Sequence, residues 1–162
     1  MLSTKLILEN IGQSVVDQLK NDIKTKSLVI GHSDPPNASG ALYDSIRYEA
    51  TEDSLKVYAL DYIYYLVHGR KAGKKPPRAV IRKWIDDKGI LPQADANGRT
   101  ISKDSLAFLI QRKIGDKGTL IAQQGGSDLL SSILTESFIQ NVKDELIFNT
   151  VNAIKSEILA IA

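Results

Sequence analysis

Two clusters in the chain contain the residue types that acid–base or nucleophilic catalysis requires. His32, Ser33 and Asp34 are the residue types of a hydrolase triad. A triad is assembled from separate elements of a fold, so three neighbours in a stretch rich in Gly, Pro and Asn favour a turn instead. Asp86 and Asp87 are the residue types of a general acid and base, but neighbours on a helix point about 100 degrees apart. We interpret this pair as the solvated end of a helix.

Cofactor and metal motifs are missing from the sequence. The 162-residue chain has no Cys and two His, which excludes zinc fingers, iron–sulfur clusters and thiolate nucleophiles. Neither G-x-x-x-x-G-K nor H-E-x-x-H occurs. We therefore predict that the protein is not an enzyme and has no cofactor or metal. The enzymatic alternative is a small nuclease that uses Asp86, Asp87 and His68.

A third cluster is basic and is the strongest candidate for ligand binding. Between residues 70 and 83 there are seven cations and no acid, and Tyr62, Tyr65 and Trp84 flank this segment. Cations beside aromatic rings can bind phosphates and stack on bases, although aromatics among aliphatic residues are more typical of cores and interfaces. The predicted interaction residues are Arg70, Lys71, Lys74, Lys75, Arg78, Arg82 and Lys83.

The net charge of +2 averages three segments of different sign. Residues 1–60 contain six Lys and Arg against eight Asp and Glu, residues 61–117 contain 13 against 6, and residues 118–162 contain 2 against 5. The net charges are thus −2, +7 and −3. If folding does not intermix them, such segregation suits head-to-tail contacts or an anionic partner.

The first half of the chain predicts a helix, a loop and a hairpin. Apolar residues from Leu2 to Ile23 recur at steps of three and four, which predicts a helix over 2–26. A loop over 27–41 follows, with Gly, Ser, Asp and Pro at 31–40. Two alternating runs predict a β-hairpin over 43–60, with its turn at 51–54. Two strands alone are marginal in water, so they must pack on helices or gain further strands.

The basic middle, residues 61–117, predicts three helices. Asp61 is a candidate N-cap for a short helix that Gly69 ends. Pro77 starts a second helix, which ends before Gly89, and residues 91–100 form a loop. The third helix starts after Ser102 and continues to Gly115.

The C-terminal segment, residues 128–161, has the longest periodic pattern. It predicts one long helix, or two helices joined near 149–152, where weak helix formers cluster. The whole chain is expected to be one α+β domain, in which long terminal helices pack on a small antiparallel hairpin or sheet, with a helical insertion at about 77–115. We find neither a secretory signal nor a membrane-spanning apolar run, so we expect a soluble protein.

The order of these motifs resembles a known family. G-A-L-Y-D-S-I-R-Y at 40–48, the hairpin pattern and Y-I-Y-Y-L-V-H-G-R at 62–70 are similar to the tail-completion, or neck, proteins of tailed bacteriophages. His68 stands where that family usually has an acid, and its R-x-P-F closing signature is missing. The segments 69–85 and 107–119 are similar to neck and ring proteins of crAss-like phages.

The resemblance implies a structural virion protein, assembled in the bacterial host cytoplasm, that forms a ring between the portal and the tail. Its expected partners are further copies of itself in a sixfold or twelvefold ring, the portal or adaptor ring, tail proteins and the packaged double-stranded DNA, with no membrane. The loops at 31–40, 70–76 and 91–100 would reach adjacent rings or the DNA channel. The expected subunit-packing residues are Tyr62, Tyr65, Trp84, Phe138 and Val142. The alternative function is a nucleic-acid-binding module that uses residues 70–83.

Overall fold

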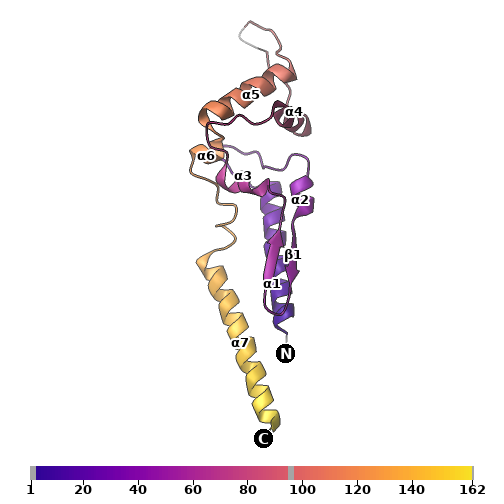
Figure 1. Cartoon of the computed structure of the whole chain (residues 1–162), viewed down its shortest axis with the longest axis vertical. Coiled ribbons are helices and arrows are strands. Elements are labelled where there is room, and N and C mark those ends of the chain that lie inside the picture. Colours follow the sequence, from indigo (N-terminus) through magenta and orange to yellow (C-terminus); the bar gives the residue numbers. More distant parts are fainter. Residues whose placement is uncertain (1–2, 95–96, 162) are drawn as a thin grey trace.

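The chain forms an elongated α+β molecule in the computed structural model, which describes residues 3–94 and 97–161 (Figure 1). This architecture confirms the predicted fold class, with long terminal helices, an antiparallel hairpin and helical insertions between them. The described elements are, in order, α1 (Thr4–Thr25), α2 (Ala41–Ser45), β1 (Arg47–Ala50), β2 (Leu55–Tyr58), α3 (Ile63–His68), α4 (Arg78–Asp87), α5 (Lys103–Lys117), α6 (Leu120–Gln123) and α7 (Glu136–Ile161).

Helix α1 forms where the periodic apolar pattern predicts it. Its start is fixed by Ser3, whose hydroxyl accepts a hydrogen bond from the Leu6 amide at 3.2 Å. The buried stripe includes Val16, Leu19 and Ile23, all at most 5% exposed. The predicted helix 2–26 is thus observed as Thr4–Thr25, and position 2 lies outside the described residues.

The hairpin packs on α1, as the marginal stability of two strands requires. Its strands pair in antiparallel register with Tyr48 opposite Val57, and the Thr51 amide donates to the Ser54 carbonyl at 2.8 Å to close the predicted turn. Close packing depends on Gly12 in α1, because a Cβ there would lie 2.5 Å from the Tyr48 ring. Large side chains on the hairpin therefore take the place of a side chain on the helix.

The hairpin begins later than predicted, because residues 43–45 belong to the short helix α2. Leu42 and Ile46 are both buried in the main core and lie four positions apart. A helical turn brings these two residues to one side about 6 Å apart along the helix axis, whereas a strand would separate them by about 13 Å. Ser45 ends the turn by donating its hydroxyl to the Leu42 carbonyl at 2.7 Å.

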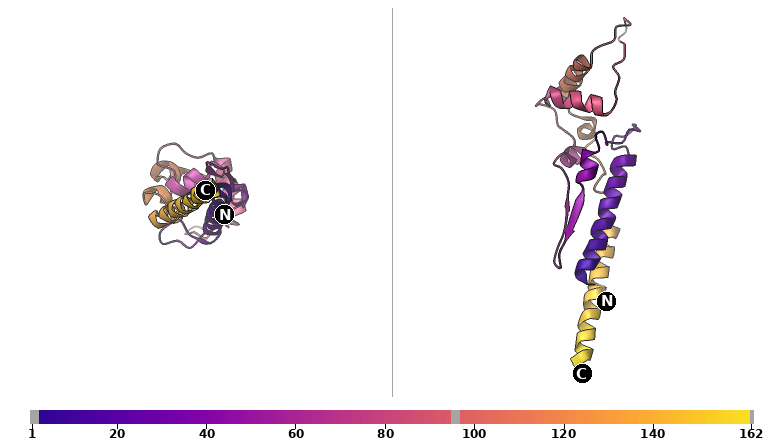
Figure 2. Two further views of the ribbon diagram at one scale, coloured as in Figure 1. Left: turned by 90° about the horizontal axis from the view of Figure 1, so that it is seen from below. Right: turned by 90° about the vertical axis from the view of Figure 1, so that its right-hand side faces the viewer.

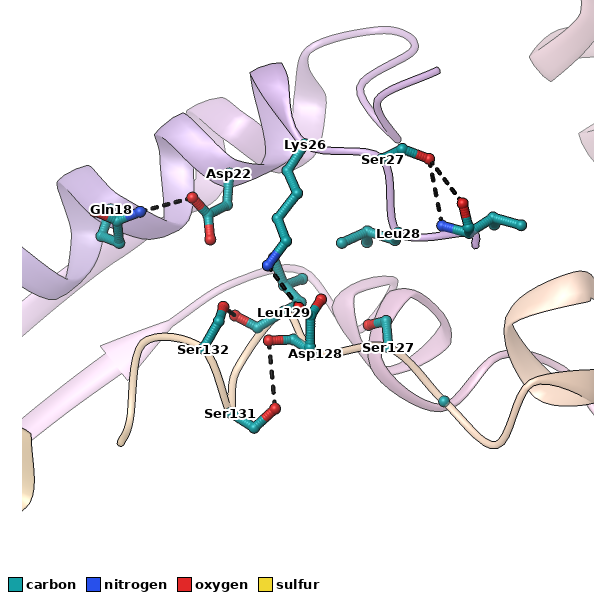
Figure 3. A network of polar contacts seen from close by, with 12 residues as sticks. Gln18, Asp22, Lys26, Ser27, Leu28, Ser127, Asp128, Leu129, Ser131 and Ser132 are labelled. Carbon is teal, nitrogen blue, oxygen red and sulfur yellow. Dashed lines mark hydrogen bonds and ion pairs between the residues drawn. The ribbon is translucent and has the colours of Figure 1, made fainter. Parts of the chain in front are cut away.

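The main core joins the C-terminal end of α1 to α2, α3 and a turn segment at 127–134. Lys26 forms an ion pair with Asp128 at 2.8 Å, and Gln18 donates to the buried Asp22 carboxylate at 2.7 Å (Figure 3). The ion pair docks the turn segment beside α1, and the Gln18 hydrogen bond pairs the buried carboxylate within α1. The buried members of this core are Val16, Leu19, Ile23, Leu28, Leu42, Ile46, Leu66, Leu129 and Ile133.

The prediction of a helix from residue 128 is wrong, because α7 begins at Glu136. Residues 128–134 instead form turns that place Leu129 and Ile133 in the core. Thr135 then starts α7, since its hydroxyl accepts a hydrogen bond from the Phe138 amide at 3.1 Å. From there the helix is continuous to Ile161, so one long helix, not two, is observed.

The insertion of α4 and α5 lies at the end of the molecule opposite the free end of α7 (Figure 1). It has a small core of its own, in which Ile81, Ile85 and Ala107 are at most 9% exposed. Two chain segments, one at Arg70 and one at Thr119, attach the insertion to the main body. They are joined by hydrogen bonds from the Thr119 amide to the Arg70 carbonyl at 2.8 Å and from the Arg70 amide to the Thr119 hydroxyl at 2.8 Å.

Three local predictions in this region need correction. Asp61 does not cap α3, because the carbonyls of residues 60–62 already accept from the first amides of the helix. Gly115 does not end α5; it is buried inside the helix, where the Lys75 side chain crosses it, and Gly118 is the C-cap. The short helix α6 was not predicted. Its cap is Thr119, whose hydroxyl accepts from the Ala122 amide at 3.4 Å.

Helix α7 runs antiparallel to α1 and extends beyond the N-terminal end of α1 (Figures 1 and 2). Its main contact among the described elements is α1. No residue of α7 whose side chain is described is buried. A 26-residue helix is therefore held at its start and along one side only.

Candidate functional site

The folded molecule separates its basic insertion from the C-terminal end of α7. The basic insertion lies at one end. The part of α7 that extends beyond α1, called here the free part of α7, lies at the other (Figure 1). Ion pairs within the described residues do not link these two ends. The surfaces of these two ends are therefore the candidate functional sites.

Two of the seven predicted interaction residues are neutralised by acids on the same element or its neighbour. Arg82 forms ion pairs with Asp86 and, at 3.4 Å, with Asp104, while Lys83 contacts Asp87 at 2.7 Å. These pairs occupy the acids at the end of α4, so the helix-end interpretation of Asp86 and Asp87 holds.

Asp86 is the centre of this ion-pair group. Lys103 of α5 donates to its carboxylate at 2.6 Å, and Arg82 donates from one turn earlier in α4. The Lys103 hydrogen bond, together with the Arg82 and Lys103 charges, holds the pKa of Asp86 below its ordinary value of 3.8. The group therefore joins α4 to α5 and is a structural feature.

Four other members of the basic run are exposed and have no ion pair among the described residues. Arg78 lies over the Phe108 ring of α5, with its guanidinium carbon 5.1 Å from the ring centroid. Such stacking orients the guanidinium and leaves its outer edge available to an anion. The four exposed cations are Lys71, Lys74, Lys75 and Arg78.

Helix α5 carries further exposed cations that the linear run did not include. Arg112 is four positions from Phe108 on the same helix, and Lys113 and Lys117 follow it; all three are exposed and form no ion pair within the described ranges. Asp116 lies among them. The residues of α5 that contact residues 75–78 are instead Phe108, Gln111 and Gly115.

Arg70 has a structural role in addition to its charge. Its guanidinium lies over the Tyr65 ring, 5.8 Å from the centroid, and its Nε donates to the Lys74 carbonyl at 3.3 Å. Arg70 is also half-buried, and its backbone joins the insertion to the main body through Thr119. It therefore shapes the base of the insertion.

The five predicted packing residues have different environments. Tyr62, the N-cap of α3, and Tyr65 within α3 are 45% and 44% exposed, so they are accessible to a partner. Trp84 instead packs on the core of the insertion. Phe138 and Val142 are half-buried on the first turns of α7.

The predicted loops differ in their contacts with the rest of the protein. Residues 31–40 are held to the insertion by Lys88, whose ammonium donates to the Pro35 carbonyl at 2.6 Å. In the loop at 91–100, Ala94 pairs with Thr100, and positions 95 and 96 lie outside the described residues.

The candidate catalytic residues are not brought together. His32, Ser33 and Asp34 are exposed, and no hydrogen bond joins their side chains in the described ranges. His68 is exposed at the end of α3, and the centroid of its ring lies 4.6 Å from the centroid of the Tyr64 ring. Among the described residues, no group of three or more His, Cys, Asp or Glu side chains lies close enough together to hold a metal ion.

Comparison with known proteins gives no match to a family model, a curated protein or a solved structure. Across the described part of the chain, none of the helices combines the length and apolar character needed to cross a membrane.

Proposed function

We propose that this chain is a structural subunit of a closed ring in the neck or tail of a tailed bacteriophage. The ring joins the portal to the tail around the DNA channel, in six or twelve copies, and is assembled in the cytoplasm of the bacterial host. The proposal rests on the resemblance of residues 40–48, 62–70, 69–85 and 107–119 to neck proteins. It assigns the chain no catalytic role.

One structural observation carries the proposal, namely that α7 has no buried residue among its described side chains. Exposed aliphatic residues on a long helix are costly in a monomer and typical of a surface that a partner covers. A heterologous ring needs two different complementary surfaces on each subunit. The apolar α7 and the exposed tyrosines of α3 lie on different elements and supply two such candidates.

Quantitative mass spectrometry of purified particles tests this proposal. We expect the chain to be present at six or twelve copies per particle, in a fixed ratio to the portal protein. A chain absent from the particle, which also forms no ring with the portal or adaptor protein, would contradict the proposal. Isolated protein that stays monomeric would not do so, because such rings can require the portal as a template.

The basic insertion supports a second candidate function, which is binding of double-stranded nucleic acid. Its surface carries exposed cations on the 71–78 segment and on α5, which have no ion pair within the described residues. Within the ring, the same surface would contact packaged DNA; as an isolated module, it would bind duplex by itself.

Charge-reversal variants test whether these cations, rather than cations elsewhere in the chain, bind the duplex. For Lys74→Glu with Lys75→Glu, we expect weaker duplex binding and a slope of log affinity against log salt reduced by about 2, because two phosphate contacts are lost. The matched control is Lys143→Glu with Lys155→Glu on α7, which changes the net charge equally. Fluorescence anisotropy at several salt concentrations measures both. Equal effects of the two variants, or no binding at low salt, would exclude the module.

A further inference from the structure

The free part of α7 has an apolar stripe with the spacing of a helix–helix seam. Ile147, Val151, Ile154 and Ile158 follow one another at steps of four, three and four. At 100 degrees per residue, these positions fall within an arc of about 60 degrees. Their exposed fractions are 61%, 42%, 52% and 61%. The stripe is therefore uncovered along its whole length.

The stripe cannot serve the contact between α7 and α1. The half-buried residues of the first turns, Phe138, Val142 and Leu146, lie on the opposite side of the helix, about 180 to 260 degrees from Ile147. In addition, α7 extends beyond α1 (Figure 2). The two apolar faces are thus separate, and the second one has no neighbour within the described chain.

The uncovered surface is large enough to form much of one side of an interface. The four stripe residues expose an apolar area on the order of a few hundred Å², and Phe148 and Leu159, which are 68% and 76% exposed, extend it on one side. Monomers rarely leave a larger patch uncovered, and a standard interface buries about 800 Å² per partner.

We infer that α7 packs through this stripe side by side with the α7 helices of neighbouring copies of the chain, so that one edge of each stripe contacts the opposite edge of the next. Steps of four and three require a partner helix with the same spacing, which α7 itself provides. The free part of α7 also extends past the other described elements (Figures 1 and 2), so a copy placed alongside can reach it only with its own α7. The inference rests on the proposed ring function and names the surface through which neighbouring subunits meet.

The charges beside the stripe fit parallel, side-by-side copies. Lys155 and Glu157 lie about 80 degrees to either side of the stripe and have no ion pair within the described part of the chain. In parallel neighbours, the Lys155 side of one helix faces the Glu157 side of the next. The pairing therefore brings opposite charges together along the seam, as flanking positions do in coiled coils.

Site-specific cross-linking tests the inference, since the chain has no natural Cys. A benzophenone–maleimide label on Ile154→Cys is photoactivated in a mixture of ¹⁵N-labelled and unlabelled full-length protein, at increasing concentration and also in complex with the portal. The matched control is a label on Ser156→Cys, which is exposed on the side of α7 opposite Ile147. Mass spectrometry identifies mixed-isotope peptides.

We expect mixed-isotope cross-links from position 154 to residues 147–159, at least about tenfold more abundant than from position 156. Cross-links to α4, α5 or another element would contradict the inference and leave a ring possible through other surfaces. Cross-links only to the portal or another protein, or no mixed-isotope product, would also contradict it. Cross-linked α7 pairs without any ring in the particle would instead preserve the inference and exclude the proposed function.

A pair of charge variants gives an independent readout. Ile154→Glu adds a charge to the stripe, whereas Ser156→Glu adds the same charge to the other side. We expect the first to weaken self-association at least about tenfold in sedimentation experiments carried out with and without the portal protein, and the second to change it little. Circular dichroism checks that both variants remain helical. Equal self-association of the two variants would overturn the inference.

Discussion

At the scale of single residues, Gly69 determines how the insertion meets the main body. It has a φ of +69 degrees, and a Cβ at this position would lie 2.8 Å from the Ala122 Cα, in the backbone of α6. Backbone cannot move aside as a flexible side chain can. Gly69 therefore combines a turn that L-residues rarely adopt with a close approach that no side chain permits.

We predict that Gly69→Ala lowers the free energy of unfolding by at least about 3 kcal/mol, because backbone strain and overpacking add. The matched control is Gly31→Ala, where φ is +79 degrees but nothing lies within 4 Å of the added Cβ. That variant should lose only about 1 to 2 kcal/mol. Urea denaturation measures both values, and equal losses would show that contact with α6 is unimportant.

Asp86 should make the contact between α4 and α5 dependent on pH. Its pKa in the folded protein is below the ordinary value of 3.8, so its ion pairs with Lys103 and Arg82 stabilise the fold above that pH. The contribution is lost as the pH falls from about 3.8 through the lower pKa of the folded state.

We therefore expect Asp86→Asn to be less stable than the natural chain at neutral pH, with a difference that shrinks below pH 3.8. Thermal unfolding across a pH series measures this difference. Asp44→Asn is the control, since this exposed carboxylate has no ion pair in the described residues. A difference for Asp86→Asn that is constant with pH would contradict the ion-pair explanation.

Single residues were predictable where a short-range pattern decides the outcome. Ser102 caps α5 as expected, because its hydroxyl accepts from the Ser105 amide three positions later. Asp61 does not cap α3, since backbone carbonyls in the preceding turn already accept the free amides. Arg112 was missed as an exposed cation of the insertion, because it lies outside the continuous basic run at 70–83.

At the scale of elements, the insertion is attached to the molecule by few contacts and has a separate core. Only Ile81, Ile85 and Ala107 are buried there, whereas the main core includes residues from α1, α2, α3 and the 127–134 turns. Free energies of local opening depend on such buried contacts. The free energy of local unfolding should therefore be lower for the insertion than for α1.

We predict that Ile85→Ala, at a fully buried position, removes about 2 to 4 kcal/mol of local stability and exposes the α4 and α5 amides. In hydrogen exchange with mass spectrometry, α1 should stay protected. The comparison is Ile23→Ala, 1% exposed in the main core, which should accelerate exchange in α1 as well. Simultaneous loss of protection in all elements for Ile85→Ala would show a single cooperative unit.

Elements with a long apolar period were predictable, and elements decided by tertiary contacts were not. The pattern identified α1 and α5 to within two or three residues. It continued through 128–134, however, because Leu130 and Leu134 fit the same helical period, while the core draws Leu129 and Ile133 into turns. Helices α2 and α6, of five and four residues, are too short to give a periodic signal.

At the scale of the whole molecule, the positions of the charged and apolar surfaces indicate more about possible contacts with partners than the net charge of +2 does. The basic insertion and the free part of α7 lie at opposite ends of an elongated chain (Figure 1). Segment charges could be counted in the sequence, but their separation in space depends on the fold. Such a molecule presents different surfaces to different neighbours, as a subunit between stacked rings must.

If the chain is the proposed phage ring subunit, a cryo-electron microscopy reconstruction of the particle tests this most directly. We predict a closed ring of six or twelve copies of this chain between the portal and the tail. Density for the full chain should fit the ring, with the α7 helices of neighbouring copies in contact. A neck and tail fully accounted for by other proteins, with no density that fits this chain, would contradict the claim.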